Sequence, residues 1–295
     1  MRRRKLFGWV RGAISLTACV GCLVAADARA EPATVYFASA DGHTQLVGYL
    51  FAPQTKGPHP AVVMLHGRAG PYSANISEGC TLVAKGNSSP CNASSLSKRH
   101  EAWGRYWADH GYLALLPDSF GPRSKGHGFK RFSHDDPDRD DVNERTVRPL
   151  DAEGASHYLQ SRDDVAPDHI FLQGWSNGAS TALNVMYRQT SISFGGFRAA
   201  MAFYPGCGPR ALISEQYRTG SPVTVFLASD DEEVSPAICH RVLDAAAKKG
   251  IPIDVVDYPG ATHDFDSPDK KRQSIEANRT ARDDVLRRAS QLFAR

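Results

Sequence analysis

The segment Gly174-Trp175-Ser176-Asn177-Gly178 constrains the fold more than any other part of the sequence. An apolar run at 169–173 precedes it and a helix-like stretch follows it, which indicates a sharp turn from a strand into a helix. Such a turn holds its serine in a strained backbone conformation and directs the hydroxyl out of the sheet. A side chain at either flanking position would collide with the neighbouring strand or helix, which accounts for the glycines. The motif predicts a nucleophile at Ser176.

A serine hydroxyl needs a base to take its proton and a carboxylate to orient that base. Both candidates lie downstream, each after a strand-like run: Asp231 follows 224–229, and His263 follows 253–258. The order Ser, Asp, His along the chain is that of the α/β-hydrolases. We therefore expect His263 to act as general base toward Ser176, and then as general acid toward the leaving group.

The identity of the carboxylate stays open between two residues, because the chain has four consecutive acids from Asp230 to Glu233. Asp231 stands three residues before Val234, a spacing common in the acid loop of this fold. Asp230 would leave the turn one residue short. The sequence therefore favours Asp231 and keeps Asp230 as the alternative.

Acyl transfer also requires donors aimed at the oxyanion that develops in the transition state. The backbone amide of Asn177, directly after the nucleophile, is the first candidate donor. The second is the amide of Arg68, which follows His66-Gly67 at the end of the third predicted strand. The side chain of Arg68 has two interpretations: it contacts an anionic substrate, or it points into water.

Short apolar runs alternate with helix-like segments, the pattern of a mostly parallel sheet covered on both faces. One α/β-hydrolase domain is predicted over 31–295, with an eight-stranded, mostly parallel sheet flanked by helices. The sequence leaves no room for a lid domain after the sixth strand, because the segment 205–222 that joins strands six and seven is too short. The predicted strands are 34–39, 45–53, 61–66, 112–117, 169–173, 199–204, 224–229 and 253–258, and the predicted helices are 96–110, 143–162, 177–188, 237–249 and 272–294.

Two long loops, 68–95 and 119–141, follow the third and fourth predicted strands. Loops at the carboxyl ends of such strands line the functional site. The acidic run at 135–141 within the second loop is, however, interpreted as solvated surface.

The first thirty residues resemble a bacterial export signal. Arg2 to Lys5 are basic, a small-residue apolar stretch covers 12–26, and Ala28-Arg29-Ala30 offers a cleavage site. Arg3-Arg4 resembles a twin-arginine signal, and the segment ending at Cys19 resembles a lipobox; both remain alternatives to plain cleavage after Ala30. The apolar stretch is too short and too weakly hydrophobic for a stable membrane span. We expect a periplasmic or secreted protein, with a lipoprotein as the variant form.

Cleavage would remove five Arg, one Lys and one Asp, a net +5, so the formal +3 of the whole chain becomes about −2. The net positive charge of the whole chain therefore comes from the signal segment. No basic stripe is interleaved with aromatic residues, so nothing indicates a nucleic-acid partner.

Four of the six cysteines remain after cleavage, and an even count in an exported protein favours disulfides. Cys80 and Cys91 bracket a loop rich in Gly, Asn and Ser, which suits one bond. Cys207 follows the sixth strand and Cys239 begins the helix after the seventh, which suits a second. Four reduced thiols are the competing interpretation. A zinc site is disfavoured because no Cys-x-x-Cys pair occurs.

Several segments together resemble the dienelactone hydrolase family of α/β-hydrolases over roughly residues 45 to 294. Founding members use cysteine within Gly-x-Cys-x-Gly, whereas this chain has Ser176, which resembles the general carboxylesterases of the family. The segments that carry the resemblance are Leu65-His66-Gly67, 112–121, 174–178, Tyr204-Pro205-Gly206, Asp231 and 258–265.

The sequence thus predicts an exported serine hydrolase that cleaves carboxylic ester or lactone bonds of small molecules through an acyl-serine intermediate. No cofactor or metal is expected, because serine, histidine and a carboxylate complete this reaction. An acyltransferase or a peptidase with the same site is the first alternative. A non-catalytic binding protein on the same scaffold is the second.

Overall fold

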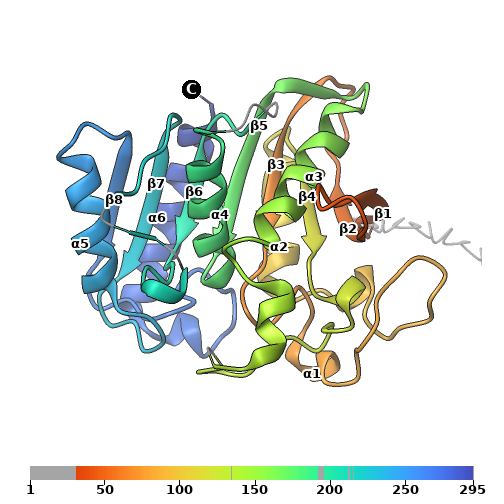
Figure 1. Ribbon diagram of the computed structural model, residues 1–295, viewed down its shortest axis with the longest axis horizontal. Helices are drawn as coiled ribbons and strands as arrows, with labels where there is room; N and C mark the ends of the chain where they lie inside the picture. Colours follow the sequence, from red (N-terminus) through yellow and green to blue (C-terminus); the bar gives the residue numbers. More distant parts are fainter. Residues whose placement is uncertain (1–30, 134, 192–195, 212, 215, 295) are drawn as a thin grey trace, which may run out of the picture. The chain divides into compact units, whose positions relative to one another are not determined.

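A single eight-stranded sheet forms the centre of the structure, a computed structural model that describes residues 31–133, 135–191, 196–211, 213–214 and 216–294 (Figure 1). The strand order is β1-β2-β4-β3-β5-β6-β7-β8. β2 pairs antiparallel with β1 and with β4, and every other pair is parallel. The strands are β1 (Ala33–Ala38), β2 (Gln45–Phe51), β3 (His59–Leu65), β4 (Leu113–Asp118), β5 (Val165–Trp175), β6 (Ala200–Phe203), β7 (Val223–Ala228) and β8 (Ile253–Tyr258).

The predicted α/β-hydrolase sheet is therefore confirmed, and its burial follows from the sequence of the strands. β4, β6 and β7 are buried at every residue, as expected for interior strands of a sheet that is covered on both faces. In the edge strand β8 only Tyr258 is buried, and the other residues are exposed or partly buried. The predicted export signal at 1–30, with Cys19 and the cleavage site at Ala30, lies outside the described residues.

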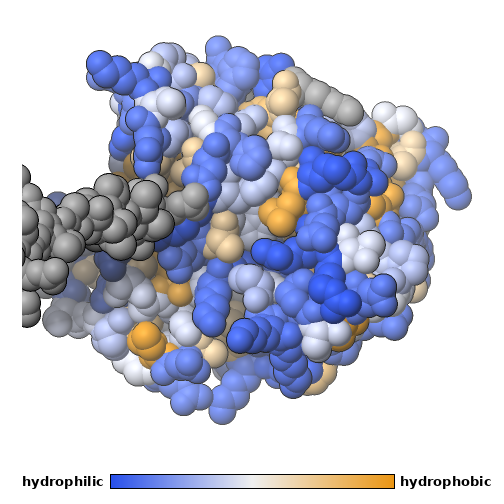
Figure 2. Space-filling view, turned by 180° about the vertical axis from the view of Figure 1, so that it is seen from behind, coloured by the Kyte–Doolittle hydropathy of each residue, from blue (hydrophilic) through white to orange (hydrophobic). Residues whose placement is uncertain are grey.

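Helices cover the two faces of the sheet and enclose two separate apolar cores (Figure 1). α3 (Arg148–Gln160), α4 (Asn177–Arg188) and α5 (Pro236–Ala247) pack on one face. α2 (Lys98–Asp109) and α6 (Glu276–Phe293) pack on the other, where they bury Trp103, Trp107 and Phe293. Seen from behind, the surface is mainly hydrophilic, with small scattered hydrophobic areas (Figure 2). No helix among the described residues has the length and apolar character needed to cross a membrane.

Two predicted helices begin later than their patterns indicated. α3 starts at Arg148 and not near 143, because the Asn143 carboxamide accepts hydrogen bonds from the backbone N–H groups of Arg145 and Thr146 and forms a separate turn. α6 starts at Glu276, after a short 3₁₀ turn at Arg272–Ser274. Sequence periodicity does not detect such local caps.

The two long loops are more ordered than their composition indicated. The first contains the short helix α1 (Ala74–Ser77), and the second contains a 3₁₀ helix at Pro137–Val142. The interpretation of 135–141 as solvated surface is wrong for Arg139, which is buried and forms an ion pair with buried Glu144 at 3.6 Å. Between β6 and β7, the described residues contain only the 3₁₀ turn Pro209–Ala211, so no lid domain is present there.

Both predicted disulfides are present in the structure. Cys80 is bonded to Cys91, and Cys207 to Cys239. The first bond joins the end of α1 to the segment that leads into α2, and the second joins the β6–β7 connection to α5. Each bond therefore fixes a loop at the end of the sheet where the candidate site lies.

A form of the protein that begins at Glu31 is expected to show no free thiol when it is denatured without reductant, and four after reduction. Reduction should lower the free energy of unfolding by about 3 kcal/mol per bond, because each bond restricts the unfolded chain. Thiol titration and urea unfolding measure the two effects. Four thiols in the unreduced, denatured protein would contradict both bonds.

Candidate active site

Ser176 occupies a strained turn between β5 and α4. Its φ of 52° and ψ of −116° lie outside the regions that ordinary residues adopt. A Cβ added at Gly174 would lie 2.2 Å from the Gly178 carbonyl oxygen, and one at Gly178 would lie 2.0 Å from the Leu65 carbonyl oxygen. The two glycines are thus required by close backbone approach, and the turn presents the serine hydroxyl at the carboxyl end of the sheet.

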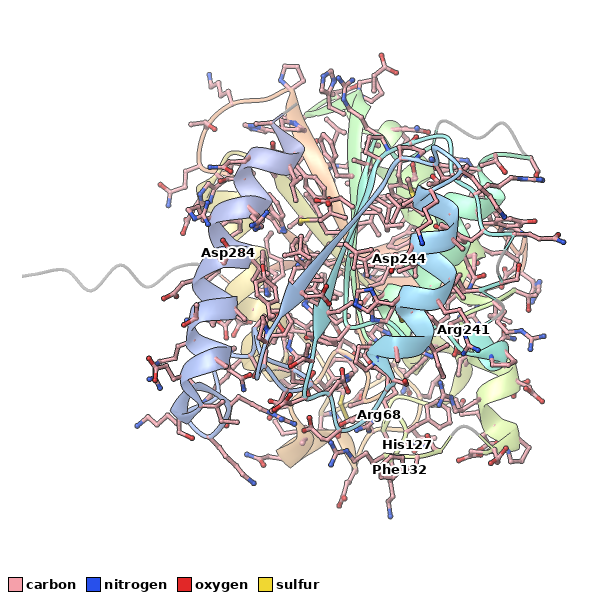
Figure 3. The ribbon with its side chains drawn as sticks, turned by 90° about the vertical axis from the view of Figure 1, so that its left-hand side faces the viewer. Arg68, His127, Phe132, Arg241, Asp244 and Asp284 are labelled. Carbon is pink, nitrogen blue, oxygen red and sulfur yellow. A yellow bond between two sulfur atoms is a disulfide. The ribbon has the colours of Figure 1, made fainter. Side chains whose placement is uncertain are left out.

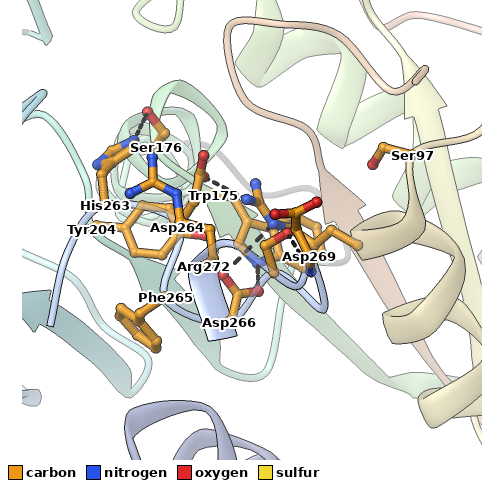
Figure 4. A network of polar contacts seen from close by, with 12 residues as sticks. Ser97, Trp175, Ser176, Tyr204, His263, Asp264, Phe265, Asp266, Asp269 and Arg272 are labelled. Carbon is orange, nitrogen blue, oxygen red and sulfur yellow. Dashed lines mark hydrogen bonds and ion pairs between the residues drawn. The ribbon is translucent and has the colours of Figure 1, made fainter. Parts of the chain in front are cut away.

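Three side chains from three loops form a row of contacts that ends at this hydroxyl. Ser176 Oγ lies 3.0 Å from His263 Nε2, and His263 Nδ1 lies 2.7 Å from Asp231 Oδ2. The contact between Ser176 and His263 is visible in Figure 4. The loops follow β5, β7 and β8, whose carboxyl ends lie at the same edge of the sheet. The arrangement provides a continuous route for a proton from the serine to the imidazole.

Asp231, and not Asp230, is the carboxylate at the imidazole. The second oxygen of Asp231 accepts hydrogen bonds from the backbone N–H groups of Glu233 (2.8 Å) and Val234 (2.9 Å), which fix the orientation of the carboxylate. Asp230 is exposed, and its carboxylate accepts a hydrogen bond from the hydroxyl of Ser229. The side chain of Asp231 is only 1% exposed, so its charge acts on the imidazole with little screening by water.

The imidazole of His263 lies in a strongly anionic setting. Burial lowers the pKa of His263, but the hydrogen bond that its Nδ1–H donates to Asp231 and the charges of Asp264, Asp231 and Glu233 outweigh it, so the pKa is raised above its usual value. Glu233 Oε2 lies 3.8 Å from His263 Nε2. The backbone N–H of His263 also donates to the carboxylate of Glu232 at 2.9 Å. These contacts fix the imidazole and stabilise its protonated form.

Asn177 directly follows Ser176 at the start of α4 and Arg68 lies in the loop after β3, and a buried arginine that the sequence analysis missed connects these two segments. Arg148 donates one hydrogen bond to the side-chain oxygen of Asn177 and a second, of 2.8 Å, to the carbonyl oxygen of His66. Its side chain is fully buried, and burial lowers the pKa of Arg148 to about 10. Arg148 therefore sets the position of the loop before Arg68 relative to the first turn of α4. Nothing in its local sequence signals this role.

The side chain of Arg68 does not point into water. Its guanidinium binds both oxygens of Glu233, at 3.0 and 3.1 Å, and donates to the carbonyl oxygen of Phe129 at 2.9 Å. The backbone carbonyl of Arg68 accepts from the N–H of Phe129 at 2.9 Å. The expectation that this side chain points into water is therefore corrected, because the second long loop and the acid loop hold it in place; its contact with an anionic substrate stays a prediction.

A buried polar network lies beneath the histidine loop (Figure 4). One carboxylate oxygen of Asp266 accepts hydrogen bonds from the indole N–H groups of Trp103 and Trp175, each at 2.8 Å. The other oxygen accepts from the hydroxyl of Tyr204. Asp266 is buried, and its partners lie on α2, β5 and the end of β6, so the network joins the loop that carries His263 to three core elements. Its members are dispersed along the sequence, which is why pattern analysis missed them.

Two cavities meet at Ser176. One, of about 380 Å³, lies beside the start of α5 and is called the α5 lobe. The other, of about 390 Å³, lies beside the start of α2 and is called the α2 lobe. Ser176, Arg68 and Glu233 line both lobes, so the Arg68–Glu233 ion pair stands at their junction. Figure 3 shows Arg68 and Phe132, a further residue of the α5 lobe, at the same end of the molecule. Among the described residues, no cluster of three His, Cys, Asp or Glu side chains is arranged to hold a metal ion.

Comparisons with known proteins give one family match. A model of a family described as the dienelactone hydrolase family matches residues 96–295, which is more than half of the chain. No curated protein matches the sequence significantly.

Solved structures share the fold at low sequence identity. A dienelactone hydrolase-like promiscuous phosphotriesterase from metagenomic libraries superposes with a TM-score of 0.64 at 18% identity, over 90% of this chain and 98% of that one. A putative dienelactone hydrolase from Klebsiella pneumoniae gives 0.62 at 14%, over 89% and 99%. A propionate-bound thermophilic esterase from Thermogutta terrifontis gives 0.60 at 15%, over 90% and 94%.

Proposed function

Since the chain belongs to the dienelactone hydrolase family, we propose that it is a serine hydrolase that cleaves carboxylic ester or lactone bonds through an acyl-serine intermediate. The observation that carries this proposal is the contact of 3.0 Å between Ser176 and His263, together with the contact of 2.7 Å between His263 and Asp231. A hydroxyl, an imidazole and a buried carboxylate in this order are the parts that acyl transfer needs.

In the first half of the reaction, Ser176 Oγ attacks the carbonyl carbon and passes its proton to His263 Nε2. Asp231 stabilises the imidazolium that forms. The backbone N–H groups of Arg68 and Asn177 donate to the oxyanion, and loss of one such donor typically costs about 2.7 to 4 kcal/mol of transition-state stabilisation. The intermediate collapses, and the leaving alcohol takes the proton from His263 Nε2.

In the second half, a water molecule attacks the acyl-serine and gives a proton to His263 Nε2. Collapse of this intermediate releases the carboxylic acid and returns the proton to Ser176. Water is the proposed acceptor because both lobes open to solvent. An acyltransferase or a peptidase would form the same acyl-serine and would differ only in the acceptor.

We further propose that the protein is exported by cleavage after Ala30 and acts in the periplasm or outside the cell. The two disulfides support this location, because such bonds persist in oxidising compartments.

Labelling with a fluorophosphonate tests the proposed chemistry directly. The reagent is expected to phosphonylate the hydroxyl of Ser176 at neutral pH, because His263 activates that oxygen. Mass spectrometry of the peptide that contains Ser176 locates the adduct, and a panel of p-nitrophenyl esters and lactones reports turnover. The absence of an adduct on Ser176 in folded protein would refute the serine-hydrolase proposal and leave the non-catalytic alternative.

The pH dependence of kcat/KM should report the protonation of His263. The base must be neutral to accept the proton of Ser176, so activity falls as pH drops through the pKa of the imidazole. Because that pKa is raised above 6.5, the midpoint of the acid limb should lie above pH 6.5. Measurement of kcat/KM for a neutral ester between about pH 5 and 9 tests this expectation. A midpoint below 6.5 would contradict the proposed anionic setting.

A further inference from the structure

The two lobes differ in their relation to the proposed general acid. His263 lines the α2 lobe and is absent from the lining of the α5 lobe, whereas Asn177 lines the α5 lobe only. During acylation, the leaving oxygen must lie where His263 Nε2 can protonate it. The alcohol part of the ester therefore extends into the α2 lobe. The acyl part, on the other side of the carbonyl carbon, occupies the α5 lobe.

The exposed surface of the α5 lobe is mainly apolar, and the charged side chains in its lining form two ion pairs, Arg68–Glu233 and Arg139–Glu144. Ser180 is the residue one turn beyond the nucleophile on α4, and its hydroxyl already donates to the carbonyl oxygen of Gly206 at 2.8 Å. At the rim, Phe132 is 69% exposed and has a positive φ of 58°, a strained conformation that turns a large ring toward solvent. The remaining apolar contributors are Cys207, Pro209, Ala211, Val234 and Ile238.

The volume and the lining of this lobe indicate the size of the group that it can hold. The volume is about 380 Å³. Ser176 and Ser180 both line the lobe and lie about 6 Å apart along the helix axis. Glu144 also lines the lobe and forms the ion pair with Arg139 there. A lobe of this volume suits an acyl group with a ring, and an acetyl group would leave most of it empty.

The α2 lobe instead offers hydrogen-bonding groups. Within the described part of the chain, the side chains of Ser73, Asn75 and Lys98 have no hydrogen-bond partner, and Asn75 and Lys98 are exposed. Together they supply a hydroxyl, an amide and an ammonium group, which serve as donors and acceptors for an alcohol rich in hydroxyls. The charges that line the lobe balance, because the cations Arg68, Lys98 and Arg99 are matched by the anions Glu233, Asp264 and Asp269. The lobe therefore suits a neutral alcohol better than an anionic one.

The walls of the α2 lobe are held in place independently of a ligand. Tyr72 and Leu96 form an isolated β-bridge, and the backbone N–H of Ser73 donates to the carbonyl oxygen of Ser95 at 2.9 Å. The Cys80–Cys91 bond closes the same pair of segments. Asn75 and Lys98 are thus carried by two braced segments, a condition for specific hydrogen bonding to a sugar-like ring.

We propose that the substrate is an ester of an apolar, ring-containing acid with a neutral polyhydroxy alcohol such as a sugar. Water cleaves the bond between the acyl carbon and the alcohol oxygen, which yields the free acid and the free alcohol. The inference rests on the proposed serine-hydrolase function and adds the assignment of each substrate part to a lobe.

Three esters test the assignment, namely 6-O-benzoylglucose, cyclohexylmethyl benzoate and 6-O-acetylglucose. The first and second have the same acid and six-membered rings of similar size, and they differ in the hydroxyl groups of the alcohol. The first and third share the alcohol and differ in the acyl ring. We expect kcat/KM to be highest for 6-O-benzoylglucose and at least about tenfold lower for each of the others, because each loses one set of contacts.

Two variants separate the lobes. Asn75→Ala should lower the ratio of kcat/KM for 6-O-benzoylglucose to kcat/KM for cyclohexylmethyl benzoate about two- to tenfold, the effect of one neutral hydrogen bond. Ile238→Trp should narrow the α5 lobe and lower the ratio of kcat/KM for 6-O-benzoylglucose to kcat/KM for 6-O-acetylglucose at least about tenfold. Fluorophosphonate labelling of each variant confirms that Ser176 remains reactive.

The outcomes distinguish this inference from the proposed function. Equal kcat/KM values for the three esters, or a preference for the cyclohexylmethyl ester, would overturn the substrate class while the hydrolase function stands. Failure to cleave any of the three by protein that still labels at Ser176 would do the same. Absence of labelling would overturn the proposed function and, with it, the inference.

Discussion

Replacement of Ser176 by alanine is expected to lower kcat for ester hydrolysis by about 10⁶-fold, as it does when the nucleophile of a serine protease is removed. The reason is that the acyl-serine cannot form, while the oxyanion donors and both lobes remain. The stability of the variant should be close to that of the parent, because the strained φ of 52° is tolerated at least as well without the hydroxyl.

Steady-state kinetics on a p-nitrophenyl ester and urea unfolding measure the two quantities. Ser161→Ala, at the exposed end of α3, is the matched control and should retain full activity. Hydrolysis by the Ser176→Ala variant within tenfold of the parent rate would show that another group attacks the ester.

Replacement of Asp231 by asparagine should lower kcat by about 10⁴-fold, because an amide favours the wrong tautomer of the imidazole and cannot stabilise its charge. The same change at Asp230 should alter kcat by less than about twofold, because that side chain is exposed and contacts the hydroxyl of Ser229 and not His263. Paired kinetics of the two variants at one pH give the comparison. A larger loss for Asp230→Asn would reverse the assignment of the carboxylate.

The elements that could be predicted from sequence are those whose signal is local. Ser176 is marked by the two glycines around it, since close backbone approach excludes a side chain at either position. The strands of the sheet are marked by continuous apolar runs, because they are buried on both faces. The preference for Asp231 over Asp230 came from spacing alone, and the structure brings Asp231 to the imidazole.

The parts of the site that escaped prediction depend on contacts between distant segments. Arg148 falls within the helix predicted at 143–162, yet its guanidinium lies buried between His66 and Asn177. Glu233 was considered only as a neighbour of the candidate acid, and in the structure it binds the side chain of Arg68 across 165 residues of chain. No local pattern reveals such pairs, because nothing in one segment specifies the partner in the other.

The two disulfides affect the cellular compartment in which the α2 and α5 lobes reach their final structure. Cys80–Cys91 closes the segments that carry Asn75 and Lys98, while Cys207–Cys239 ties the wall of the α5 lobe to the helix that carries Ile238. Neither bond contributes an atom to the relay of Ser176, His263 and Asp231. In a reducing compartment, a newly made chain would therefore bring the three reactive side chains together, but the walls of both lobes would be less constrained. Formation of the two disulfides would then increase selectivity between substrates more than it increases turnover.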